Sequence, residues 1–282
     1  MIAHVAVIGA GTMGHGISAV AVMAGMHVAL ADDDPVAPAA ALIRIGTTLD
    51  RAIERGKLRV EDRAATLGRV RAAAGLADAV RDADLVIEAI PERLELKQAL
   101  FRELEGLAPR DAILATNTSS LSVSAIAEAV ATPGRVVGMH FFNPVPAMRL
   151  VEIVRGRATD ERTLAAARAF AAELGKTAIV VQDSPGFATS RLGVVLGLEA
   201  IRMLEAGVAS AEDIDRAMEL GYNHPMGPLR LGDLVGLDVR LAIADHLHAT
   251  LGGDTYAAPE LLRSMVAQGR LGQKSGEGFY RW

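Results

Sequence analysis

Short apolar runs alternate with longer amphipathic segments over the first two thirds of this chain. The runs are apolar throughout, which is typical of strands buried on both faces of a sheet. They predict strands at residues 5–8, 28–30, 85–90, 113–116, 136–139, 151–154 and 178–181. Between them, helical periodicity predicts helices at residues 13–24, 37–55, 94–107, 123–129 and 163–174. This order predicts an α/β fold with βαβ units and a mostly parallel sheet.

The pattern changes after Ser184-Pro185-Gly186, a sequence that favours a turn. Strand-like runs stop there, and helices are predicted at residues 188–205, 211–220, 237–251 and 259–268. We therefore predict two domains, the sheet domain over residues 1–184 and an all-helical C-terminal domain over residues 185–282.

Composition narrows the class of protein. The 282 residues carry 29 Lys and Arg against 34 Asp and Glu, a net charge of -5, which argues against a nucleic-acid or anionic-membrane partner. There is no cysteine, which excludes a disulfide framework, thiolate metal sites and thiol catalysis, and fits a reducing compartment. Residues 7–31 lack charged side chains and have the length of a membrane span, but their five glycines and two histidines favour a strand and a glycine-rich turn. With no leader segment recognisable, we expect a cytoplasmic protein.

The sequence Gly9-Ala10-Gly11-Thr12-Met13-Gly14 matches the pattern G-x-G-x-x-G between the first predicted strand and the first predicted helix. In a dinucleotide-binding turn, Gly9 makes the tight turn, Gly11 lets the backbone approach a pyrophosphate, and Gly14 lets the helix pack closely on the sheet. The first domain is therefore predicted to be a Rossmann-like NAD-binding domain. The alternative is a glycine-rich turn in an unrelated α/β protein.

Asp32 ends the second predicted strand, 18 residues after Gly14. A carboxylate at this place accepts hydrogen bonds from the ribose hydroxyls of a bound dinucleotide. Asp33 and Asp34 add negative charge that would repel a 2′-phosphate, so NAD is predicted rather than NADP. The alternative is that these three aspartates form a solvated loop.

Two polar clusters follow predicted strands, at residues 117–120 and 140–144, where open α/β sheets bind their ligands. Glu152 lies inside an apolar run, and a buried carboxylate needs a partner. His140, 12 residues earlier, is the obvious candidate, because a carboxylate orients an imidazole and stabilises its protonated form. Arg149 and Arg155 are alternative partners for Glu152. Likewise, His140 can be an ordinary surface or core residue, and Ser119 or Ser122 can be only a helix N-cap.

With these motifs the chain resembles the short-chain L-3-hydroxyacyl-CoA dehydrogenase family, of the 3-hydroxybutyryl-CoA dehydrogenase type. The most specific part of the resemblance is the run His140-Phe141-Phe142-Asn143-Pro144-Val145-Pro146 together with Leu150-Val151-Glu152. The other stretches that carry it are Ile8–Gly14, Val86–Pro91, Thr116–Leu121, Asp183–Phe187, His224–Pro228 and Lys274–Tyr280.

The resemblance implies reversible, NAD-dependent oxidation of L-3-hydroxyacyl-CoA, above all 3-hydroxybutyryl-CoA, to 3-ketoacyl-CoA. His140 would be the general base and Glu152 would hold it. Ser119 and Asn143 would hydrogen-bond substrate oxygens near the nicotinamide. Family positions that contact the cofactor are matched here by Glu92, Lys97 and Lys274, in addition to Gly9, Gly11, Thr12, Met13, Gly14, Asp32, Ser119 and Asn143.

The family also implies a coenzyme A site and an assembly. Residues 37–71 match an excursion that helps to hold coenzyme A, with Thr48 and Arg55 as candidate contacts. The alternative is an ordinary solvated helix face, on which arginines alternate with Asp50 and Glu54. The expected partners are the acyl-CoA substrate and a second copy of the chain, in a homodimer formed through the helical domain. No metal is expected.

One position departs from the family pattern. After Pro185-Gly186-Phe187 the family commonly has an asparagine that helps to fix the substrate, and this chain has Ser190. Serine offers one hydroxyl where the amide offers a carbonyl and two N–H donors. We therefore keep two alternatives: a dehydrogenase of the same fold for a free hydroxy acid, of the L-gulonate type, and an NAD-binding relative with weak or lost catalysis. Acyl chain length, direction and pathway (fatty-acid β-oxidation, butanoate metabolism or aromatic-acid degradation) stay open.

Overall fold

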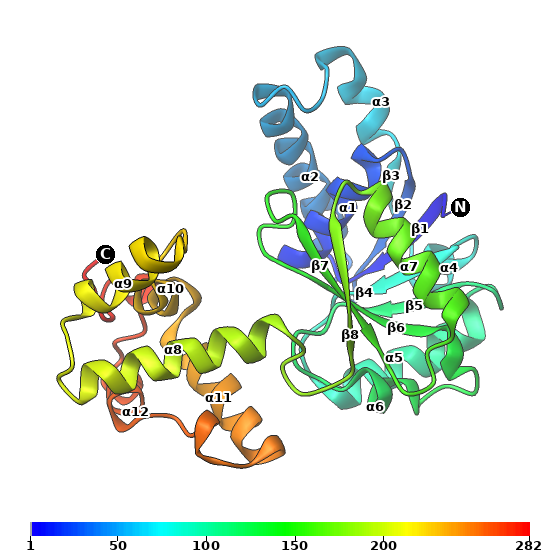
Figure 1. Cartoon of the computed structure of the whole chain (residues 1–282). Helices are drawn as coiled ribbons and strands as arrows, with labels where there is room; N and C mark the ends of the chain where they lie inside the picture. Colours follow the sequence, from blue (N-terminus) through cyan, green and yellow to red (C-terminus); the bar gives the residue numbers. More distant parts are fainter. Residues whose placement is uncertain (1) are drawn as a thin grey trace. The chain divides into compact units, whose positions relative to one another are not determined.

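The computed structural model describes residues 2–282, and their contacts divide them into two compact units (Figure 1). The first unit ends at Ser184, and the second comprises Pro185–Trp282. The α/β class predicted from the sequence, with a helical C-terminal part, is confirmed.

The first unit is built on one eight-stranded sheet with the order β3-β2-β1-β4-β5-β6-β7-β8. Neighbouring strands run parallel, except that β6 and β7 are antiparallel. The predicted strands are all present to within two residues at either end, and β3 is an addition. The bounds are β1 His4–Ile8, β2 His27–Ala31, β3 Val70–Ala72, β4 Leu85–Glu88, β5 Ile113–Thr116, β6 Val136–Phe141, β7 Leu150–Arg155 and β8 Thr177–Gln182.

Helices pack on this sheet because its strands are apolar on both faces. On one face, side chains such as Ile17, Ile45 and Phe170 from α1, α2 and α7 share a core with Val7 and Leu30 of the sheet. The central strands β4, β5 and β6 have no exposed residue, as the uninterrupted apolar runs predicted. The helices are α1 Thr12–Met23, α2 Ala37–Glu54, α3 Arg63–Leu67, α4 Leu76–Val80, α5 Leu94–Leu107, α6 Val123–Ala127 and α7 Glu161–Glu173.

The second unit consists of helices around a core of its own, which includes Leu198, Leu229, Leu237 and Leu247. Its helices are α8 Thr189–Glu205, α9 Ala211–Tyr222, α10 Pro228–Val235, α11 Leu237–Leu251 and α12 Glu260–Ala267. The sequence analysis predicted all of these except α10.

Residues 2–282 contain neither a helix that is long and apolar enough to cross a membrane nor a group of three or more His, Asp or Glu side chains that could hold a metal ion. The uncharged stretch at residues 7–31 folds as the last two residues of β1, the glycine loop, α1 and β2.

Candidate active site

The glycine loop joins β1 to α1, and two of its glycines are required by close contacts. Gly9 has a φ of 107°, and a Cβ atom there would lie 2.5 Å from the carbonyl oxygen of Ala89. A Cβ atom on Gly14 would lie 1.7 Å from the carbonyl oxygen of Gly9, so this glycine lets the helix approach the loop. At Gly11 a Cβ atom would meet nothing within 4 Å, and no side chain caps the helix there. The loop therefore has open space beside the amides at the start of α1, including those of Thr12 and Met13, where a pyrophosphate fits.

Asp32 lies directly after β2 and borders the same loop. Its Oδ2 accepts a hydrogen bond from the Ala10 amide (2.6 Å), and its Oδ1 accepts one from the Asp34 amide (3.0 Å). Partial burial acts to raise the pKa of Asp32, but these amides outweigh it and lower the pKa below its usual value. The carboxylate is thus ionised beside the loop, as an acceptor for ribose hydroxyls must be. Loop and carboxylate together fit an NAD molecule.

His140 and Glu152 form a buried pair between neighbouring strands. They lie directly opposite each other in the antiparallel ladder of β6 and β7, and the His140 Nδ1 to Glu152 Oε2 distance is 2.8 Å. The His140 residue is 7% exposed and Glu152 is fully buried. Of the alternative partners, Arg155 pairs with Glu161 instead (2.7 Å). An imidazole held in this way can exchange a proton with a bound alcohol or ketone.

The segment after β5 is organised around one carboxylate oxygen, Glu92 Oε1. It accepts hydrogen bonds from the Thr118 hydroxyl (2.5 Å) and from the amides of Ser119 (2.9 Å) and Ser120 (3.1 Å). Partial burial acts to raise the pKa of Glu92, but the Thr118 hydroxyl, the Lys97 charge and the two amides lower it overall. Ser122, and not Ser119, is the N-cap of α6. Ser119 is therefore positioned by Glu92 at the edge of the sheet where β5 and β6 end.

Lys97, predicted as a cofactor contact, is almost completely buried. Its Nζ lies 2.5 Å from Glu88 Oε1 and 3.4 Å from Glu92 Oε2. Of the two predicted contacts on this segment, Glu92 therefore has the more accessible side chain, and the contact of Lys97 with the cofactor stays a prediction.

A cavity of about 820 Å³ brings Thr12 of the glycine loop together with Asn143, Thr48 and Arg55. It is strongly basic. Five of its lining residues are cationic side chains, and one is a carboxylate; these are Arg51, Arg55, Lys57, Arg149, Lys176 and Glu173. The sequence analysis missed Lys57, Arg149 and Lys176, because three separate segments carry them and no local motif joins them.

Lys176 is the most constrained cation of this cavity. Its Nζ donates to the carbonyl oxygens of Val145 and Met148, both at 2.7 Å. Burial, and then the charge of Lys57, lower its pKa from the usual value. Like charges crowded at one cavity favour the binding of a polyanion, since an anion relieves their repulsion.

Two predicted site residues belong to the second unit. Ser190 lies in the first turn of α8, and it is partly buried. Lys274 forms an ion pair with Asp238, with Nζ to Oδ2 at 2.6 Å, and this hydrogen bond is the main reason why the pKa of Asp238 is lowered. Their roles stay predictions.

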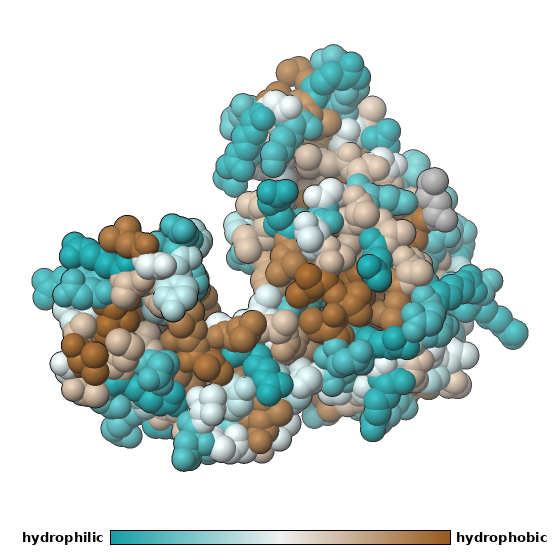
Figure 2. Space-filling view, in the orientation of Figure 1, coloured by the Kyte–Doolittle hydropathy of each residue, from teal (hydrophilic) through white to brown (hydrophobic). Residues whose placement is uncertain are grey.

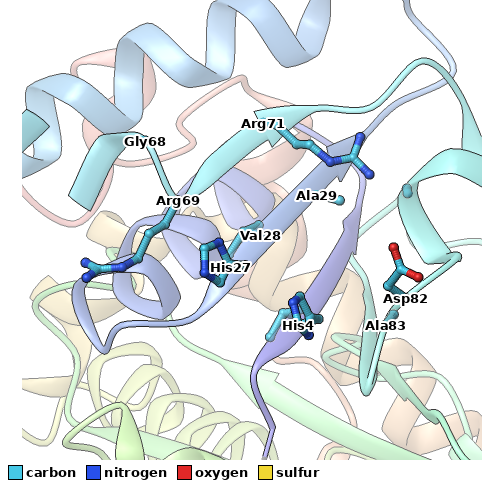
Figure 3. Close-up of a pocket in the computed structure, with 11 residues that line it drawn as sticks. His4, His27, Val28, Ala29, Gly68, Arg69, Arg71, Asp82 and Ala83 are labelled. Atoms are coloured by element: carbon cyan, nitrogen blue, oxygen red, sulfur yellow. The ribbon is translucent and has the colours of Figure 1, made fainter. Parts of the chain in front are cut away.

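A second, smaller cavity of about 210 Å³ lies at the opposite end of the sheet, where β1 and β2 begin (Figure 3). It is lined by His4 and His27, the first residues of β1 and β2, and their rings stack with centroids 5.6 Å apart. Since the glycine loop, Ser119 and His140 lie at or near the carboxyl ends of their strands, this cavity is separate from the candidate active site.

Comparison with protein families matches both units. The model for the 3-hydroxyacyl-CoA dehydrogenase, NAD binding domain matches residues 4–184. The model for the 3-hydroxyacyl-CoA dehydrogenase, C-terminal domain matches residues 186–282.

Individual proteins are similar over the whole length. A probable 3-hydroxybutyryl-CoA dehydrogenase of Bacillus subtilis (strain 168) is 45% identical, over 99% of this chain and 97% of that protein. A 3-hydroxybutyryl-CoA dehydrogenase of Mycobacterium tuberculosis (strain H37Rv) is 44% identical, over 100% of this chain and 99% of that one. The crystal structure of (S)-3-hydroxybutyryl-CoA dehydrogenase from Ralstonia eutropha has a TM-score of 0.96 at 40% identity, covering 100% of this chain and 99% of that one.

Proposed function

Because this chain belongs to the 3-hydroxyacyl-CoA dehydrogenase family, we propose that His140, held by Glu152, is the general base of its reaction and that L-3-hydroxybutyryl-CoA is its substrate. The chain is an NAD-dependent oxidoreductase that interconverts 3-hydroxyacyl-CoA and 3-ketoacyl-CoA. The observation that carries the proposed mechanism is the 2.8 Å bond between a buried imidazole and a buried carboxylate. The four-carbon acyl group is proposed from the names of the similar proteins.

The pair moves the proton of the reaction. With Nδ1 bonded to Glu152, His140 takes the proton of the 3-hydroxyl at Nε2, and the C3–O bond becomes a carbonyl. The glycine loop and Asp32 would hold NAD, which would supply the acceptor for the hydride that leaves C3 with its electron pair. Glu152 stabilises the imidazolium that results, because its negative charge is desolvated and close. In the reverse direction the imidazolium returns its proton to the ketone oxygen.

Other residues bind and orient. Ser119, at the end of β5, and Asn143, after β6, are proposed to hydrogen-bond substrate oxygens near the nicotinamide. The basic cavity with Thr48 and Arg55 is proposed to hold the phosphates of coenzyme A, since it offers five cations to a polyanion. Lys97, Lys274 and Ser190 are proposed to act as the family resemblance implies.

The molecule is proposed to be a cytoplasmic homodimer formed through the helical unit. Several large apolar side chains on that unit are exposed, including Leu192 (71%) and Leu220 (80%). Figure 2 shows apolar residues, coloured brown, on the surface of the helical unit. A second copy of the chain is the partner that would cover it.

The test of the substrate is a comparison of acyl-CoA with free acids. We expect the purified protein to oxidise NADH with acetoacetyl-CoA, and to leave free acetoacetate and L-gulonate with NAD largely unconverted, measured by absorbance of NADH. A higher catalytic efficiency with the free acids than with acetoacetyl-CoA would favour the alternative raised by Ser190, a dehydrogenase of the same fold for a free hydroxy acid. Binding of NADH without turnover on any 3-ketoacyl-CoA would favour a relative that has lost catalysis.

A further inference from the structure

Glu88, the last residue of β4, is a fully buried carboxylate that the mechanism above does not use. Its Oε1 accepts hydrogen bonds from the Ile90 amide (2.8 Å) and from Lys97 Nζ (2.5 Å). Its Oε2 accepts one from the Thr116 hydroxyl (2.6 Å), at the end of β5. A buried charge is tolerated only with such partners, so Glu88 is the fixed end of a polar network.

Lys97 extends this network towards the active site. A lysine ammonium has three N–H donors. Three oxygens surround this one, namely Glu88 Oε1 at 2.5 Å, the Ile90 carbonyl at 3.3 Å and Glu92 Oε2 at 3.4 Å. The other oxygen of Glu92 holds the amides of Ser119 and Ser120. A continuous path therefore runs from the buried Glu88 through Lys97 and Glu92 to Ser119.

We propose that Glu88 is a positioning residue for the dehydrogenation, acting on Ser119 through Lys97 and Glu92. The proposal rests on the proposed function, in which Ser119 orients the substrate near the nicotinamide. If Glu88 lost its charge, the buried Lys97 cation would have Glu92 as the remaining carboxylate within 4 Å. The attraction would then draw Glu92 towards Lys97 and away from the Ser119 amide.

The substitution Glu88→Gln tests this with little change of volume. At saturating NADH and acetoacetyl-CoA we expect kcat to fall roughly 10- to 100-fold, the range that a misplacement of about 1 Å produces. Because the effect passes through Ser119, the double variant Glu88→Gln/Ser119→Ala is expected to stay within about 2-fold of Ser119→Ala alone. The pH profile of kcat/KM should keep its midpoints, since Glu88 has no bond to the His140–Glu152 pair.

Glu105→Gln is the matched control. Glu105 also accepts hydrogen bonds from two loop amides, those of Ala131 (2.7 Å) and Thr132 (2.9 Å), but this loop precedes β6 at the other edge of the sheet. The control should keep wild-type kcat, and combined with Ser119→Ala it should add nothing to the loss caused by Ser119→Ala.

Two outcomes would overturn the proposal: wild-type kcat in Glu88→Gln, or losses from Glu88→Gln and Ser119→Ala that simply multiply, as a general structural defect would give. If Glu88→Gln does not fold, Glu88→Asp draws the carboxylate away from Lys97 by one methylene group and decides by the same comparison with Ser119→Ala. A wild-type protein inactive on every 3-ketoacyl-CoA would instead contradict the proposed function, so the two failures are distinguishable.

Discussion

At the scale of single residues, the decisive feature is a carboxylate with no exposed surface placed against an imidazole. Glu152 is fully buried, and its Oε2 lies 2.8 Å from Nδ1 of His140. A carboxylate in such a place fixes which nitrogen of the imidazole faces it. An amide at position 140 could still form a hydrogen bond with Glu152, but it could not take up a proton.

His140→Gln is therefore expected to keep NADH binding and lose turnover. General acid–base catalysis contributes about 10²- to 10⁴-fold, so kcat for acetoacetyl-CoA should fall by roughly that factor. Fluorescence titration measures NADH binding, and steady-state absorbance measures kcat. His4→Gln, at the other edge of the sheet, is the control and should retain both. Near-wild-type kcat in His140→Gln would remove His140 from its role.

His140 and Glu152 could be predicted from the sequence because each differs in polarity from its neighbours. Glu152 interrupts an apolar run, and a charge there demands a partner at strand-to-strand distance. The sequence left three partners open, and the antiparallel register of β6 and β7 settles on His140. The path from Glu88 to Ser119 could not be predicted, because it joins residues 88, 92, 97 and 119 through folding alone.

At the scale of elements, α2 carries one wall of the basic cavity. Thr48 and Arg51 lie on this helix, and Arg55 is its C-cap residue. Cations at a helix C-terminus are also favoured by the helix dipole.

Arg55→Gln is expected to weaken coenzyme A binding without slowing the chemical step. A hydrogen bond to a charged group contributes about 1.5–3 kcal/mol, so KM for acetoacetyl-CoA should rise roughly 10-fold or more while kcat stays near wild type. Arg59→Gln is the matched control, since Arg59 pairs with Asp62 and does not line the cavity. A KM unchanged in Arg55→Gln would place the phosphates elsewhere.

The loop after β5 makes the stability of the first unit depend on pH through Glu92. Its folded-state pKa lies below the ordinary 4.5. The folded protein therefore binds this proton more weakly than the unfolded chain, and the stabilisation is complete above pH 4.5 and lost as the pH falls through the folded-state pKa. Thermal unfolding should show Glu92→Gln less stable than wild type at pH 7, with the difference shrinking below about pH 4.5. Glu95→Gln, exposed on α5, corrects for the change of net charge, and a difference that grows on acidification would contradict the assignment.

The elements that the sequence analysis missed, β3, α3, α4 and α10, are short and have weak patterns. In β3 one residue of three is buried, so no apolar run marks it. In α10, Pro228 at the first position and Gly227 before it resemble a turn, and eight residues give little periodicity. The long helices and the apolar strands were predicted because burial of a whole face imposes their period on the sequence.

At the scale of the whole molecule, division into two units follows from two separate cores. The core of the sheet unit includes strand residues such as Leu85 and Ile153, and the core of the helical unit includes residues such as Leu198 and Leu247. Each unit matches its own part of the 3-hydroxyacyl-CoA dehydrogenase family, so the family resemblance inferred from the motifs is confirmed over the whole chain. Quaternary structure lies beyond such patterns, since apolar periodicity does not distinguish a core from an interface.

The proposed homodimer leads to the prediction that a charge on the apolar surface of the helical unit separates the two copies. Leu220 on α9 is 80% exposed, and a second copy covering it would bury most of a leucine side chain, which is worth about 1.5–3 kcal/mol per copy. An aspartate there would instead have to lose its hydration at the interface, so Leu220→Asp is expected to sediment as a monomer at micromolar concentration where wild type sediments as a dimer. Val60→Asp places the same charge on an exposed apolar residue of the first unit, 70% exposed, and should leave the dimer intact. NADH binding by Leu220→Asp should persist, because the glycine loop and Asp32 belong to the first unit. A wild-type protein that sediments as a monomer, or a Leu220→Asp variant that still sediments as a dimer, would overturn this assignment of the interface.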